Sequence, residues 1–76
     1  MFKRKNILVF RTSVEAWETV LKIKPLLDRL VEDTGRWNFD LEDCDRILRV
    51  ESNHLIAQQV VDLLRKNGIF IKELEE

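Results

Sequence analysis

Residues 36–52, "RWNFDLEDCDRILRVES", decide the fold because their apolar side chains recur at every second position. In the first half, Trp37, Phe39 and Leu41 alternate with polar residues, which is the pattern of a half-buried strand. The next four residues, "EDCD", form a tight polar turn, and "RILRVES" is a second strand of the same kind. The sequence therefore predicts a β-hairpin in the middle of the chain.

A strand and a helix precede this hairpin. The segment "NILVFR", residues 6–11, is rich in β-branched and aromatic residues and is predicted to be a strand. Proline at position 25 removes one helical hydrogen bond, so we expect a kink near residues 21–25, or one helix ending there and another resuming. The apolar stripe that predicts this helix consists of Ala16, Val20, Ile23, Leu27 and Leu30.

A helix and a strand follow the hairpin. The second helix should end at Lys66-Asn67-Gly68, where glycine can adopt the left-handed conformation that terminates helices. The last strand is "IFIKEL", residues 69–74. The apolar stripe of the second helix consists of Ile56, Val60, Leu63 and Leu64.

Side-chain caps are expected at the start of both helices. Thr12 and Glu15 have the spacing of a capping box, in which each side chain binds a free backbone amide of the first turn. Ser52 or Asn53 is placed to cap the second helix.

The predicted order is strand, helix, strand, strand, helix, strand within one domain, residues 1–76. Two crossovers around a central hairpin predict an α+β fold, the ferredoxin-like βαββαβ sandwich, with a four-stranded antiparallel sheet and two helices on one face. This fold serves many functions, so the function has to be argued from particular residues.

Composition and charge exclude several functions. The formal net charge of −1 argues against nucleic-acid binding, and the basic start, Lys3 to Lys5, is expected to be a solvated terminus. The third strand carries no aromatic residue on which a base could stack. The apolar run "ILVF" is too short for membrane insertion. Cys44 is the only cysteine, which suits a reducing, cytoplasmic location.

The chain resembles the heavy-metal-associated domain, the fold of small copper chaperones, over nearly its full length. Aligned without gaps to the G-M-x-C-x-x-C stretch of that family and the helix after it, Val20, Ile23 and Leu27 match in type. "FDLEDCDRILRVE" resembles the hairpin of the family, and "VVDLLRKNGIFIKEL" resembles its second helix and last strand. "KIKPLLD" is similar to a bacterial branch that carries a proline in the first helix.

The metal ligands of that family are missing from this chain. The two cysteines of the family fall on Ala16 and Thr19, which cannot supply the thiolates that Cu(I) prefers. We expect Cys44 to lie in the hairpin turn, at the opposite end of the sheet from the metal loop, where it cannot replace them. The resemblance therefore implies neither a metal nor a cofactor at the family site.

The resemblance implies a docking surface instead, because chaperones of this family contact a partner protein through their metal loop. Trp17 could point outward or pack against Leu21 one turn on. Phe70 is exposed if Ile69 points inward, and is part of the core if it does not. The candidate partner-binding residues are Ser13, Val14, Glu15, Trp17, Glu18 and Phe70.

The preferred hypothesis is a non-enzymatic interaction module, for which a protein partner or self-association through edge strands is possible. One alternative is a metal-binding protein with atypical ligands, Cys44 with His54 or ligands between chains. Another is a small-ligand regulatory domain. No acid–base pair or glycine-rich anion loop supports an enzyme, so no catalytic residue is assigned.

Overall fold

The computed structural model describes residues 6–33 and 35–74; the basic segment Lys3 to Lys5 lies outside these ranges. Strands and helices follow in the predicted order along the chain. Their bounds are β1 Asn6–Thr12, α1 Trp17–Val31, β2 Arg36–Asp40, β3 Ile47–Ser52, α2 Ala57–Lys66 and β4 Ile71–Glu73.

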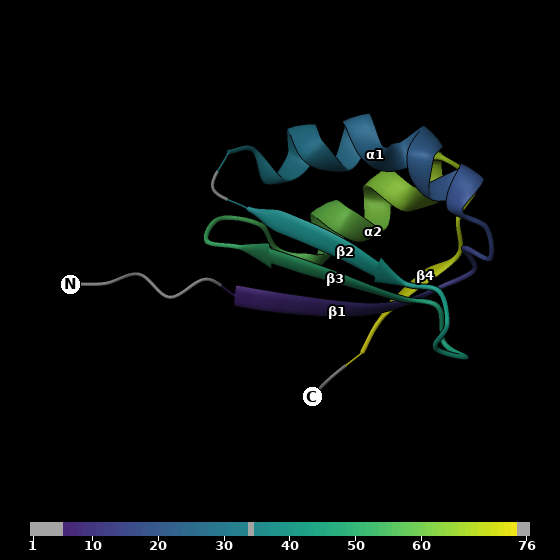
Figure 1. Cartoon of the computed structure of the whole chain (residues 1–76). Coiled ribbons are helices and arrows are strands. Elements are labelled where there is room, and N and C mark those ends of the chain that lie inside the picture. The colour runs from purple at the N-terminus through teal and green to yellow at the C-terminus, as the bar shows by residue number, and fades with distance from the viewer. Residues whose placement is uncertain (1–5, 34, 75–76) are drawn as a thin grey trace.

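The four strands form one antiparallel sheet in the order β2-β3-β1-β4. Both helices lie on the same side of this sheet, with α1 over β2 and β3 and α2 near β4 (Figure 1). The chain is thus an α+β protein with the sheet and helices that the sequence predicts. No helix in the part of the chain that the structure describes has the length and apolar character needed to cross a membrane.

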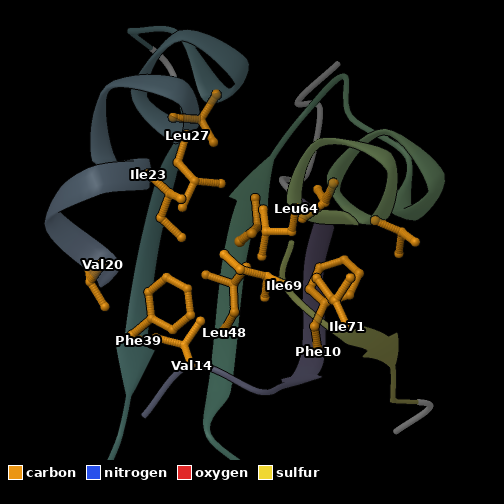
Figure 2. Packing of buried hydrophobic residues seen from close by; sticks show 14 of the residues in the cluster. Phe10, Val14, Val20, Ile23, Leu27, Phe39, Leu48, Leu64, Ile69 and Ile71 are labelled. Atoms are coloured by element: carbon orange, nitrogen blue, oxygen red, sulfur yellow. The ribbon is translucent and has the colours of Figure 1, made fainter. Parts of the chain in front are cut away.

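The core lies between the sheet and the two helices (Figure 2). Alternate strand residues point into it, so that Phe10, Leu48 and Ile71 are completely buried. Each helix contributes one apolar stripe, because residues three and four apart share a face. The predicted place of Ala16 in the first stripe is wrong, since Ala16 precedes α1 and is exposed. The buried helix residues are Val20, Ile23, Leu27 and Val31 of α1 and Val60, Val61 and Leu64 of α2.

The predicted capping box at the start of the first helix is wrong. Thr12 is the last residue of β1, and its buried hydroxyl donates to the carbonyl oxygen of Arg46 at 2.7 Å. The same hydroxyl accepts the Val14 amide at 3.2 Å. The helix begins only at Trp17, after Ala16, which has no side-chain hydrogen bond to give. The hydroxyl that the spacing assigned to the helix cap therefore binds Arg46, the residue before β3, instead.

Helix α1 continues through Pro25 without a break, so the expectation that one helix ends and another resumes is wrong. Pro25 is exposed, as is Leu21, whose carbonyl loses its helical donor. Water can hydrogen-bond to a carbonyl on this side of the helix, so the interruption does not end the helix.

The start of α2 also differs from the prediction. Ser52 does not cap the helix, because its hydroxyl accepts the amides of His54 and Leu55 in the segment before it. The amide of Ile56 is bound instead by the side chain of Gln59, at 2.9 Å. Ile56 precedes the helix and is 63% exposed, so its predicted place in the core stripe is wrong.

The end of α2 is as predicted. Gly68 adopts a positive φ of 77°, and its amide binds the carbonyl of Arg65. The amide of Ile69 binds the carbonyl of Leu64 at 3.0 Å, which completes the two-bond termination that glycine favours. This turn directs the chain from α2 into β4.

Candidate functional site

Three connections meet at one end of the sheet, which we call the loop end: residues 13–16, 41–46 and 67–70. The amide of Thr12 binds the carbonyl of Asp45 at 3.2 Å. Because β1 and β3 are antiparallel, the end of β1 meets the start of β3. The expectation that the turn with Cys44 lies at the opposite end from residues 13–16 is therefore wrong, since both belong to the loop end.

Ser13 and Phe70 are held together by two hydrogen bonds. The Ser13 amide donates to the Phe70 carbonyl, and the Phe70 amide donates to the Ser13 hydroxyl, both at 3.0 Å. Ile69 points into the core (Figure 2), whereas Phe70 is 64% exposed. Of the two arrangements that strand alternation allowed, the structure has the one that leaves Phe70 at the surface.

Trp17 points outward rather than into the margin of the core. It is 58% exposed, and Leu21 one turn later is 66% exposed. Glu15 and Glu18 beside it are exposed too. Val14, by contrast, is 2% exposed and belongs to the core, so its side chain is not available to a partner.

Trp17 and Leu21 continue along one side of α1 as Lys24 and Asp28, at spacings of three and four residues that place them on the same face. We call these four residues the α1 flank. Asp28 accepts a hydrogen bond from Lys24 Nζ at 2.8 Å and another from Trp37 Nε1 at 2.8 Å. These two hydrogen bonds hold the pKa of Asp28 below its ordinary value. Because Trp37 is part of β2, the α1 flank lies over that edge of the sheet.

Ala16 and Thr19, the two positions that the resemblance aligns with cysteines, hold no group that copper favours as a ligand. Ala16 is exposed and carries only a methyl group. Thr19 is half-buried in the first turn of α1, where its amide binds the carbonyl of Ala16 at 3.1 Å. A hydroxyl and a methyl cannot replace two thiolates as ligands for Cu(I).

Cys44 and His54 lie at opposite ends of β3, so the structure does not bring them together within one chain. The imidazole of His54 instead lies 3.1 Å from the Ser52 hydroxyl. Cys44 has other neighbours that the sequence reasoning missed, although their adjacency in "DCD" was visible. Its thiol and the carboxylates of Asp43 and Asp45 lie within 4.8 Å of one another.

Both of these carboxylates already have protein partners. Asp43 accepts the amide of Asp45 at 2.9 Å, and Asp45 forms an ion pair with Arg11 at 3.4 Å. The three groups are adjacent in one exposed turn, which accounts for their closeness. On the open face of the sheet, Arg49, Glu51 and Lys72 form no ion pair within residues 6–33 and 35–74.

Comparison with known proteins gives no match: no family model, no curated protein and no solved structure is similar to this chain. The function therefore has to be inferred from the residues of the loop end and of the α1 flank.

Proposed function

We propose that the chain is a non-enzymatic protein-interaction module that binds its partner with Trp17 and Leu21. Its order of elements fits a ferredoxin-like fold, and the proposal takes up the resemblance of its sequence pattern to a heavy-metal-associated domain, with Ala16 and Thr19 in the place of the two cysteines. The single cysteine suits a cytoplasmic location. The observation that carries the proposal is the pair of large apolar side chains exposed on successive turns of α1.

Exposed tryptophan is a strong indication of binding because it offers a large apolar area together with a hydrogen-bond donor. Tryptophan is also among the residues that contribute most to binding free energy at protein interfaces. The helix that carries Trp17 is fixed by Val20, Ile23 and Leu27, which are buried in the core between the helix and the sheet. A partner therefore meets a surface that is already ordered, and little conformational entropy is lost on binding.

Metal binding is the weaker candidate. Within one chain it would require Cys44 and His54 to act together, yet they lie at the two ends of β3. The closer group, Asp43 with Cys44 and Asp45, has its carboxylates engaged by the backbone and by Arg11. A regulatory small-ligand site has no particular residue in its favour.

Site-specific photocrosslinking tests the proposal and does not require the partner to be identified first. A photoreactive phenylalanine analogue is placed at position 17, and in a matched control at Lys22, which is exposed on another side of the same helix. In the native host, irradiation should give a discrete protein adduct for position 17 that is absent for position 22. Equal adduct patterns from both positions, or none from position 17, would refute a docking role for Trp17.

A further inference from the structure

Within residues 6–33 and 35–74, strand β2 is an edge of the sheet, with β3 on one side and no strand on the other. An edge strand presents unpaired amide and carbonyl groups that can pair with another strand. The opposite edge, β4, has only three residues, whereas β2 has five. Strand β2 is therefore the longer of the two edges on which another chain could add a strand.

Strand β2 begins with a basic residue, Arg36, and ends with an acidic one, Asp40, so two antiparallel copies of it have complementary charges. Phe39 points into the core, so Arg36, Asn38 and Asp40 lie together on the open face of the sheet. If two copies of β2 pair antiparallel with Asn38 opposite Asn38, each Arg36 lies directly opposite Asp40 of the second copy. Opposite charges in directly facing positions stabilise antiparallel strands.

Both charges remain available for such a pairing. Arg36 faces Glu51 of β3, but it forms no ion pair within the described residues. Asp40 uses Oδ1 to accept the amides of Glu42 and Asp43, and its second oxygen has no partner among the described residues. Across β3, Asp40 faces Ile47, which offers it no charge.

We propose that the partner is a second copy of this chain, joined through β2 about a two-fold axis at Asn38. This inference rests on the proposed function, of which it names the partner. The two four-stranded sheets then form one continuous eight-stranded sheet, counted from the four strands of each copy. No other antiparallel register of the two strands pairs Arg36 with Asp40, so the charges select this one.

The α1 flank extends the same interface above the sheet. It lies over β2, with Trp17 toward the Asp40 end and Asp28 toward Trp37. The two-fold axis therefore places Trp17 of one copy opposite the far end of α1 in the other. An open hollow of about 520 Å³ lies there, lined by Val31, Gly35 and Trp37 together with the charged Asp28, Glu32, Asp33 and Arg36. Trp17 would enter that hollow, where Val31 and Trp37 are the apolar residues that its ring can contact.

The charge of the chain permits self-association. A formal net charge of −1 leaves only weak repulsion between two copies. In the symmetric interface each contact occurs twice, so two Arg36–Asp40 pairs and two Trp17 contacts form at once. A heterologous partner would need a matching acidic and basic strand of its own, whereas a second copy already has one.

Sedimentation velocity over micromolar to millimolar concentrations tests the pairing with charge-reversal variants. Wild type should form a dimer, and both Arg36→Asp and Asp40→Lys should raise its dissociation constant by about tenfold or more, because two attractive pairs become repulsive. Mixing the two variants should restore the dimer, since one copy then presents two acids and the other two bases. Far-UV circular dichroism checks that each variant folds, because Asp40 also binds two amides of the turn.

The outcomes separate this inference from the proposed function. Restoration of the dimer in the mixture supports the β2 interface. A wild-type dimer that neither reversal weakens, but that Trp17→Ala dissociates, overturns the β2 interface and keeps Trp17 as a docking residue. A chain that stays monomeric over the whole range also overturns the inference, and the photocrosslinking experiment alone then decides the docking role.

Discussion

Replacing Thr12 with valine should destabilise the protein through the loss of two hydrogen bonds at the loop end. Valine has nearly the same shape, so packing is preserved, but the Arg46 carbonyl and the Val14 amide lose their partner. An unsatisfied buried amide costs about 1–3 kcal/mol, and a partly hydrated carbonyl costs less, so we expect a loss of about 2 kcal/mol. For a chain of 76 residues, total stability is about 4–11 kcal/mol, so the variant should still fold.

The matched control is Thr12→Ser, which keeps the hydroxyl and removes one methyl group. Its expected cost is about 0.8 kcal/mol, from the lost apolar burial alone. Urea denaturation followed by far-UV circular dichroism gives both free energies of unfolding. The free energy of unfolding should be lower for Thr12→Val than for Thr12→Ser. Equal values would contradict the role of the hydroxyl in holding the end of β1 to Arg46.

Three further predictions concern the turn, the flank and the thiol. Gly68→Ala should lower the free energy of unfolding by about 1–2 kcal/mol, because φ is 77° there and alanine adopts this left-handed conformation at a cost. An added Cβ meets no other atom within 4 Å, so this backbone cost is the whole effect. Unchanged urea unfolding would contradict this. The pKa of Asp28 is lowered in the folded protein. Its hydrogen bonds therefore stabilise the protein at a pH above the ordinary aspartate pKa, and this stabilisation is lost as the pH falls below about 4. Asp28→Asn should therefore show a smaller loss of stability on acidification, and parallel curves for both proteins would contradict the assignment. Under reducing conditions, competition with a chromogenic chelator should show no submicromolar binding of Cu(I) or Zn(II). Submicromolar binding that the Cys44→Ser variant abolishes would support the metal alternative.

Element types and order follow from the sequence because the apolar periodicities of strands and helices are strong and local. The alternation at Trp37 and Phe39 and the helical spacing of Val20, Ile23 and Leu27 each identify a buried face without help from distant residues. The glycine at position 68 is similarly local, since few other residues accept its backbone conformation.

Two predictions failed because they depended on residues that are distant in sequence. The Thr12 hydroxyl was assigned to a helix cap, but it binds Arg46, which lies 34 residues away in sequence. The place of Cys44 depended on which strands are neighbours in the sheet. The exposure of Trp17 and Phe70 could be stated only as alternatives. Alternation and helical spacing do not show whether other parts of the chain cover a residue at the edge of the core.

The central claim is that Trp17 is exposed in the free chain and is covered by a partner. The measurement that tests it most directly is acrylamide quenching of a Trp37→Phe variant, in which Trp17 is the only remaining tryptophan. Because Trp37 lines the hollow, sedimentation velocity first checks that this variant dimerises as wild type does. At the lowest concentration the quenching constant should approach that of a free indole, and it should fall as the dimer forms. A strongly protected indole at every concentration would contradict the claim, because Trp17 would then belong to the core of a single copy.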